Sequence, residues 1–176
     1  MMDPISELKT RAEILHRRIQ TGDLTAIRRL RALPEFRRAA DEGLVSATIQ
    51  RTHCLAVIAA ELGFANWPQA KSALTGDSPV EDFGTMLYPK RAGGHVNRWY
   101  KGYEEAAEVR KACDGYLLAY QRHYLVVDRF YIESLGVEPD DPDWRALGFD
   151  WVRPKDPAAR TRLYGKLVAL LPRDAV

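Results

Sequence analysis

The chain has 176 residues, of which 46% are hydrophobic and 28% are charged, and a chain of this length buries about 70% of its unfolded surface. This composition excludes a disordered protein and one that needs metals or disulfides to hold a core. The formal net charge of +2 excludes the strongly basic face of a typical nucleic-acid-binding protein, and no apolar run approaches the roughly 20 residues of a membrane span.

Apolar residues at helical spacing predict a series of short helices before residue 76. We expect helices over residues 5–19, 23–33 and 44–62, with a short segment of undecided structure at 35–41. Gly22 and Pro34 end the first two helices, because glycine adopts positive φ without strain and proline cannot continue a helix. Helices joined by tight breaks are typical of a small bundle.

The stretch around Gly63 predicts a helical hairpin. Gly63 lies where a helix C-terminus needs a residue with positive φ, and Phe64 can fold back onto the last turn. Asn66 can cap the next helix, with Trp67 and Pro68 in its first turn, where a missing amide proton costs nothing. We therefore expect Phe64 and Trp67 to pack in the corner between two helices.

The segment IAAELGFANWPQAK resembles a helical module of bacterial proteins with sequences of the type LAREYGFPSWPRLK, which often precedes ankyrin-like repeats or is fused to other domains. The resemblance covers residues 51–74. It rests on Ala59, Glu61, Gly63, Phe64, Trp67, Pro68 and Lys71. It implies a helical scaffold without assigned catalytic residues, and it implies nothing about the chain after residue 77. Corner packing alone also accounts for Phe64 and Trp67.

The same region, from Ala56 to Leu74, also imitates a DNA-binding helix-turn-helix, in which a glycine lies in the turn before a recognition helix. The second helix fits this motif poorly. Gln69 lies where an apolar residue is usual, Pro68 lies where a base-reading side chain is expected, and Lys71 is its one cation. Because phosphate contacts supply most of the non-specific affinity, nucleic acid is not the expected partner.

The segment 75–79, TGDSP, has the composition of a linker and predicts a boundary between two units, residues 1–76 and 77–176. In the second unit we expect helices over residues 97–113, 128–135, 143–147 and 157–171. Residues 116–120 and 124–127 predict two short strands, or alternatively the whole segment is one buried helix. The predicted fold class is mainly α: a small helical bundle with at most a minor β-hairpin in the C-terminal half.

The loop before residue 97 is a candidate anion site. Its charged residues and glycines are Lys90, Arg91, Gly93, Gly94, His95 and Arg98. A cationic, glycine-rich loop that leads into a helix N-terminus attracts anions through free amide protons and the helix dipole. The residues expected to bind an anion are Lys90, Arg91 and Arg98, with His95 beside them, although an ordinary surface loop has the same composition.

Every tyrosine of the chain lies after residue 82. Tyrosine and tryptophan combine a large apolar body with a polar tip, so this density suits a ligand pocket, a protein interface or a core built from large side chains. Tyr103 and Tyr124 are the tyrosines that we expect in a binding surface. We also expect Trp151 in this binding surface, because it lies between Asp150 and Arg153 in a proline-bounded loop.

His95 and His123 are the candidate acid–base residues of an enzyme that acts on a small anionic substrate. With Asp128 or Glu104 they could also form a two-histidine, one-carboxylate metal site, but no pair has the spacing of ligands on one helix face. We therefore assign no metal site and leave the cofactor open.

The sequence thus favours a cytoplasmic binding or interaction protein whose binding surface lies in the C-terminal half. The start, MMDPISELKT, lacks the pattern of a signal peptide, and Cys54 and Cys113, far apart in helical surroundings, favour buried thiols over a disulfide. The expected partner is a small anionic molecule or a protein, a second copy of this chain included. An enzyme that uses His95 and His123 is the first alternative, and a DNA-binding regulator is the second.

Overall fold

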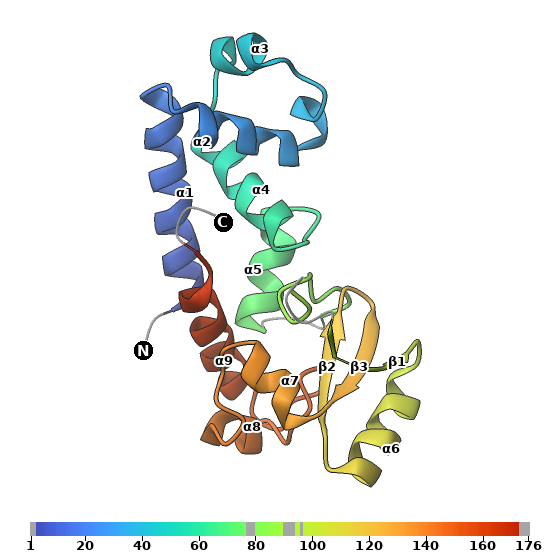
Figure 1. Ribbon diagram of the computed structural model, residues 1–176. Coiled ribbons are helices and arrows are strands. Elements are labelled where there is room, and N and C mark those ends of the chain that lie inside the picture. Colours follow the sequence, from blue (N-terminus) through green and yellow to red (C-terminus); the bar gives the residue numbers. More distant parts are fainter. Residues whose placement is uncertain (1–2, 77–79, 90–93, 96, 173–176) are drawn as a thin grey trace.

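The computed structural model describes residues 3–76, 80–89, 94–95 and 97–172. The helices of the first half are α1 Pro4–Gln20, α2 Leu24–Arg28, the 3₁₀ helices η1 Arg29–Ala32 and η2 Pro34–Phe36, α3 Asp41–Ser46, α4 Arg51–Glu61 and α5 Trp67–Thr75. The long helix α1 runs along one side of the molecule, with α4 and α5 beside it, and one small sheet lies at the far end from α2 and α3 (Figure 1). This mainly helical architecture confirms the predicted fold class.

The first two helices begin at aspartate caps, close to the starts of the predicted ranges. Asp3 accepts a hydrogen bond from the Ser6 amide at 3.0 Å and caps α1, whose apolar stripe is buried. Asp23 accepts one from the Thr25 amide at 2.9 Å and caps α2. The chain then tightens into 3₁₀ turns up to Phe36, so the helix predicted over 23–33 is confirmed in its start and changes type before its end.

The continuous helix predicted over residues 44–62 is wrong. The chain forms α3 and α4 instead, separated by an extended break that begins at Ala47, where φ is −73° and ψ is 140°. The next residues, Thr48 and Ile49, are β-branched and have reduced helix propensity. The amide of Gln50 then donates to Nδ1 of His53 at 3.0 Å, which starts α4 as a separate helix.

The predicted corner between α4 and α5 is confirmed. Gly63 has a φ of +83°, and the amide of Gln69 donates to Oδ1 of Asn66 at 2.9 Å. Phe64 is buried, and Trp67 is partly buried against the same apolar core. Local start and stop signals are therefore enough to position this corner.

The sheet contains β1 Arg98–Tyr100, β2 Tyr116–Tyr120 and β3 His123–Val127 in the spatial order β1-β3-β2. Both neighbours of β3 are antiparallel to it, so that Trp99 and Leu118 both lie opposite Leu125. The predicted hairpin is confirmed, with a two-residue turn at 121–122, and the alternative of one buried helix is wrong. Leu117 and Val126 face α6, which covers one side of the sheet, whereas Leu118 and Leu125 belong to the main core.

The helix predicted over residues 97–113 begins later than expected. Its first residues form β1, and α6 covers Tyr103–Cys113. Gly102 precedes α6 with an extended backbone, and Trp99 and Tyr100 are aromatic residues that favour strands. Pairing with β3 decides the conformation of β1, and the helical spacing of the local sequence does not reveal that partner.

Residues 83–85 tie the corner of the first half to the sheet. The amide of Thr85 donates to the carbonyl of Leu62 at 2.8 Å. The amide of Phe83 donates to the carbonyl of Gln121 at 3.0 Å, and the Gln121 amide donates back to the carbonyl of Gly84 at 2.7 Å. Backbone hydrogen bonds therefore connect the end of α4 to the turn of the hairpin.

The last three helices are α7 Arg129–Ser134, α8 Pro142–Ala146 and α9 Pro157–Leu170. Asp128, Asp141 and Asp156 cap these helices, whose positions match the predicted ranges. Helix α9 packs against α1 and α5, and one cluster of buried apolar residues includes members from both halves of the chain. The boundary at residue 76 stays a prediction, because part of the linker lies outside the described residues. None of the helices in the described ranges is long and apolar enough to cross a membrane.

Candidate functional site

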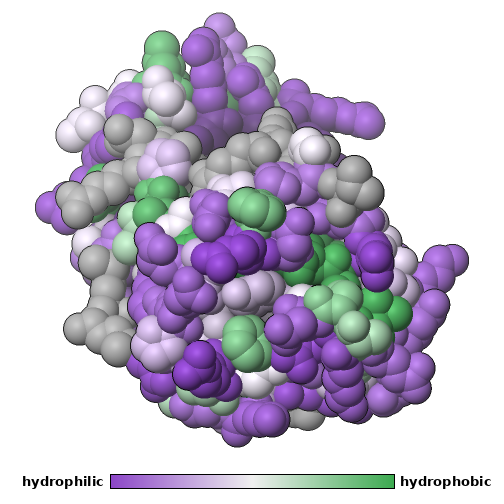
Figure 2. Space-filling model, turned by 60° about the horizontal axis from the view of Figure 1, so that its bottom comes forward, coloured by the Kyte–Doolittle hydropathy of each residue, from purple (hydrophilic) through white to green (hydrophobic). Residues whose placement is uncertain are grey.

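A cleft of about 740 Å³ opens at the end of the sheet where β1 and β2 begin and β3 ends. Its other walls are the C-terminal end of α6, the start of α7 and the segment that leads into α8. Figure 2 shows the lower face of the molecule, where hydrophilic side chains dominate and small hydrophobic patches lie between them. The volume falls within the roughly 300–1,000 Å³ of small-molecule sites in proteins.

Arg98 and Arg145 give the cleft unpaired positive charge. Arg98 begins β1 and Arg145 lies in the last turn of α8, and both side chains are exposed on the lining. Within the part of the chain that the structure describes, neither guanidinium group forms a hydrogen bond or an ion pair. Arginine stays charged and presents a planar set of donors, so this pair suits a carboxylate or a phosphate.

Several other charges of the lining already have partners. Arg129 pairs with Asp140 at 3.2 Å, and Lys166 of α9 pairs with Asp141 at 2.6 Å. Asp128 is occupied as the cap of α7, because its Oδ1 accepts a hydrogen bond from an amide of that helix at 2.9 Å. The unpaired arginines are therefore the cations of the lining that a ligand can reach without breaking an existing ion pair.

Aromatic rings form the apolar part of the lining. Tyr116 and Phe149 meet edge to face with their centroids 5.4 Å apart. The Tyr116 hydroxyl donates to the carbonyl of Pro139 at 3.0 Å, and burial raises the pKa of Tyr116, which keeps this donor neutral. The guanidinium of Arg110 lies 5.2 Å from the centre of the Phe149 ring, and its Nε donates to the carbonyl of Gly115 at 3.1 Å. These contacts fix the rings without a ligand.

Backbone strain is concentrated at the same place. Among the described non-glycine residues three have positive φ, and two of them, Asp114 at 50° and Phe149 at 57°, line the cleft. The Phe149 conformation persists because its amide donates to the carbonyl of Trp144 at 2.8 Å and its carbonyl accepts from the Leu117 amide at 2.9 Å. Strained residues cluster at functional sites, which favours this cleft as the site.

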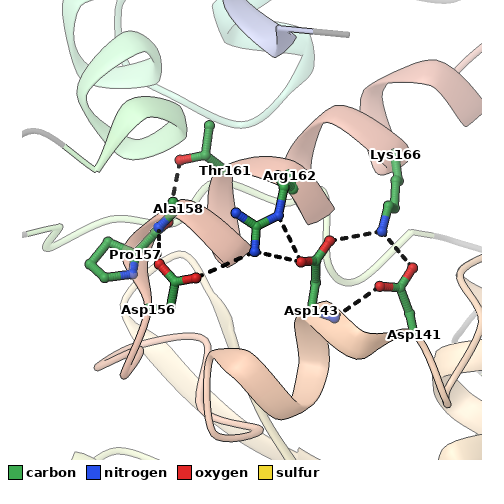
Figure 3. A network of polar contacts seen from close by, with 8 residues as sticks. All are labelled: Asp141, Asp143, Asp156, Pro157, Ala158, Thr161, Arg162 and Lys166. Atoms are coloured by element: carbon green, nitrogen blue, oxygen red, sulfur yellow. Dashed lines mark hydrogen bonds and ion pairs between the residues drawn. The ribbon is translucent and has the colours of Figure 1, made fainter. Parts of the chain in front are cut away.

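A network of charged side chains holds α8 against α9 (Figure 3). Asp143 is buried and accepts hydrogen bonds from Arg162 Nε at 2.7 Å and from Lys166 Nζ at 2.8 Å. Lys166 also donates to Asp141, and Arg162 also pairs with Asp156. Burial by itself would raise the pKa of Asp143, but the two cations outweigh burial and hold the pKa below its ordinary value of 3.8.

Replacing Asp143 with asparagine is expected to lower the free energy of unfolding by about 2 kcal/mol at pH 7, because Arg162 and Lys166 lose their shared carboxylate. Since the folded-state pKa is lowered, the contribution of Asp143 is complete above the unfolded value of 3.8 and disappears as the pH falls through the folded value. The difference between the two proteins should therefore shrink below about pH 4, as measured by urea denaturation across pH.

The matched control is Asp140→Asn. Asp140 is 86% exposed in its ion pair with Arg129, so this substitution should change the free energy of unfolding by less than about 0.5 kcal/mol. A loss for Asp143→Asn that is the same at every pH would show that packing, and not the ionised carboxylate, stabilises the contact between α8 and α9.

The charged and histidine residues predicted from the sequence lie in different places. Arg98 lines the cleft, whereas Lys90 and Arg91 lie outside the described residues. His95 packs its ring edge to face on a buried tyrosine of α7, with the centroids 5.4 Å apart. His123 is exposed at the start of β3, which is the opposite end of the sheet from the cleft. The structure therefore does not bring the two histidines to the arginines of the cleft.

The predicted aromatic residues all lie outside the lining of the cleft, and of the three only Tyr103 and Tyr124 contact each other. Tyr103 and Tyr124 pack edge to face at 6.0 Å between the sheet and α6. The Tyr103 hydroxyl donates to Asp150 at 2.5 Å, and Arg153 stacks on the same ring at 3.8 Å. Burial and the bond to Asp150 raise the pKa of Tyr103. Trp151 is fully buried, and its Nε1 donates to a tyrosine hydroxyl of α9 at 3.2 Å, which makes it a core residue.

Sequence reasoning missed most of the lining. It did not single out Arg145, Asp114, Tyr116 or Phe149 as members of one site. The cap at Asp141 predicts the helix that carries Arg145, but no local signal places that helix across from the start of β1.

Among the described residues, His95 and His123 do not belong to a cluster of metal-ligating side chains. In the described ranges, no group of three histidine, cysteine, aspartate or glutamate side chains is arranged to hold a metal ion. Cys54 is buried, and burial raises its pKa to about 11. Cys113 is exposed on the lining of the cleft, so the expectation of a buried thiol is wrong there, because the α6 side chains that pack on the sheet include Ala106 and Val109 but not Cys113.

The region that imitates a helix-turn-helix is part of the bundle. Ala70, Ala73 and Leu74 are buried, and α5 packs against α1 and α9. Nearby arginines are engaged in ion pairs: Arg28 and Arg31 with Asp41, and Arg29 with Glu61.

Comparisons of the chain with models of known protein families, with curated proteins and with solved structures gave no match. The resemblance of residues 51–74 to a bacterial helical module stays a prediction. The function must therefore be argued from the chemistry of the cleft.

Proposed function

We propose that the protein is a cytoplasmic binding protein that holds a small organic anion in the cleft at the end of its sheet. The observation that carries this proposal is the presence on the lining of one cleft of two arginines, Arg98 from β1 and Arg145 from α8, whose guanidinium groups have no partner among the described residues. Guanidinium groups recognise carboxylates and phosphates through parallel hydrogen bonds, which provide both affinity and orientation. The free thiols of Cys54 and Cys113 are consistent with a reducing compartment.

The apolar part of the lining supports an organic ligand over a bare inorganic ion. Tyr116 and Phe149 are held by ring contacts and by hydrogen bonds of the Tyr116 hydroxyl and the Phe149 backbone. A preformed surface of this kind lowers the cost of ordering the site when a ligand binds. A ligand with an apolar body and an anionic group would contact both the rings and the arginines.

Isothermal titration calorimetry of the full chain with benzoate, phenyl phosphate and succinate tests the proposal. We expect at least one of these anions to bind, and we expect Arg98→Gln and Arg145→Gln each to weaken that binding by about tenfold or more, because a hydrogen bond between charged groups contributes roughly 1.5–3 kcal/mol. Arg122→Gln is the control, since Arg122 lies exposed in the hairpin turn at the other end of the sheet. The proposal is wrong if none of the anions binds in the millimolar range, or if all three variants bind like the unmodified protein.

A further inference from the structure

The cleft carries an unpaired negative charge in addition to its two arginines. Asp114 follows α6 as its C-cap and is exposed on the lining. Across the described parts of the chain, its carboxylate has no hydrogen bond and no ion pair. Asp128, Asp140 and Asp141, by contrast, all have the partners described above. The charges available to a ligand are therefore two positive and one negative.

Local physics disfavours a carboxylate at the position of Asp114. The C-terminal end of a helix carries partial negative charge, so a carboxylate there lowers stability, whereas a cation raises it. Asp114 also has a φ of 50°, a conformation that asparagine or glycine adopts equally well without adding charge. A residue that contradicts local preference beside a cleft is expected where the site needs its chemistry.

We infer that the ligand of the cleft is a small zwitterion, whose anionic group binds Arg98 and Arg145 and whose cationic group binds Asp114. This inference rests on the proposed function, because it specifies the ligand of the same cleft. The last carbonyl groups of α6 lack partners within their own helix, so they add to the attraction for a cation at that end.

The cost of desolvation explains why a ligand with charge of only one sign does not suit the cleft. A ligand that fills the cleft removes water from the charged groups on its lining, and a buried charge without a counter-charge is costly. A purely anionic ligand would leave the carboxylate of Asp114 buried without a counter-charge. A purely cationic ligand would leave both arginines without one. A ligand with both signs compensates all three groups.

Amino acids and short peptides have this chemistry. A peptide of two or three residues carries an ammonium group at one end and a carboxylate at the other, with apolar side chains that suit Tyr116 and Phe149. Its size is compatible with a cleft of about 740 Å³.

Three probes of similar size test the contributions of the positive and the negative charge of the ligand separately. They are the dipeptide leucylalanine, which has both charges, N-acetylleucylalanine, which is only anionic, and leucylalaninamide, which is only cationic. Titration calorimetry of the full chain should show that the free dipeptide binds at least about tenfold more tightly than either capped form, which corresponds to one compensated charge.

Asp114→Asn tests the cationic subsite. Asparagine tolerates the positive φ of this position, so the variant keeps the backbone of the α6 C-cap. It should abolish the advantage of leucylalanine over N-acetylleucylalanine and leave the affinity for the acetylated probe unchanged or higher. Glu108→Gln is the matched control, because Glu108 is exposed on α6 away from the cleft. Circular dichroism confirms that each variant is folded.

The outcomes distinguish this inference from the proposed function. If the acetylated dipeptide binds as tightly as the free dipeptide, or if Asp114→Asn preserves the difference between them, the zwitterion inference is wrong and the anion site stands. If none of the three probes binds in the millimolar range, the zwitterion inference is overturned. If benzoate, phenyl phosphate and succinate also fail to bind, the proposed function is overturned with it.

Discussion

Replacing Arg11 with methionine is expected to lower the free energy of unfolding by about 3 kcal/mol and the melting temperature by roughly 10 °C. Arg11 is only 4% exposed, although it is always charged. Its Nη2 donates to the carbonyl of Val168 at 2.9 Å, and its Nη1 donates to the carbonyls of Leu171 and Pro172 at 3.3 and 3.4 Å. These carbonyls lie at the end of α9, where helical hydrogen bonding stops. Arg11 therefore caps α9 from α1.

The expected loss is large because several groups lose the buried guanidinium as a hydrogen-bond partner, and the carbonyl of Val168 keeps only the Leu171 amide at 3.2 Å. Glu7 accepts a hydrogen bond from Arg11 Nε at 2.9 Å, and the carbonyl of Val168 lies in a buried contact with the same guanidinium. Methionine keeps the length and the helix propensity of the side chain but satisfies none of these groups.

Urea denaturation followed by circular dichroism measures the difference for Arg11→Met. Arg17→Met on the same helix is the control, because Arg17 is exposed and its side chain has no hydrogen bond or ion pair within the described residues. It should change stability by less than about 0.5 kcal/mol. Equal losses for the two variants would mean that positive charge on α1, and not the cap of α9, matters.

The elements that were predictable from the sequence are those whose signals are local. Asp128, Asp141 and Asp156 each accept a hydrogen bond from an amide within three residues. The signal that starts each of these helices is therefore contained in a short stretch of sequence. The stop at Gly63 and the cap at Asn66 are of the same kind. The break between α3 and α4 was missed because the apolar spacing continues across it, although the backbone does not.

The candidate site was less predictable because distant segments assemble it. Arg98 was identified as an anion-binding residue, but at a helix N-terminus, and the structure places it in a strand that pairing with β3 creates. Arg145 reaches the same cleft because Asp143 ties α8 to α9. Neither β3 nor α9 is close in sequence to the arginine that it helps to position.

The aromatic residues show the same limit of local reasoning. Their density after residue 82 was equally consistent with a binding surface and with a core. Tyr131, Trp144, Trp151 and Tyr164 are fully buried in the core, whereas Tyr116, which is also a buried core residue, and Phe149 contribute to the lining of the cleft. Which role an aromatic residue takes depends on segments that pack on it from elsewhere in the chain.

Gly63→Ala is expected to cost about 4 kcal/mol, the largest effect of any alanine that we consider. Gly63 has a φ of +83°, and a Cβ built on it would lie 2.4 Å from Cγ2 and 2.8 Å from the backbone nitrogen of Thr85. The Thr85 amide cannot move away without losing its hydrogen bond to the carbonyl of Leu62 at 2.8 Å. The substitution therefore combines backbone strain with overpacking.

Gly22→Ala separates the two causes. Gly22 has nearly the same φ, +79°, but a Cβ there would meet nothing within 4 Å, so this variant should lose only about 1 kcal/mol. Chemical denaturation of both variants measures the difference between their losses in free energy of unfolding. This difference is the part of the loss at Gly63 that comes from the close approach of residues 83–85 to the corner. Since those residues also bond to Gln121 in the hairpin turn, Gly63→Ala should strain the connection between the first half and the sheet as well. If the two alanines cost the same, positive φ is the whole requirement at Gly63, and the approach of Thr85 is adjustable.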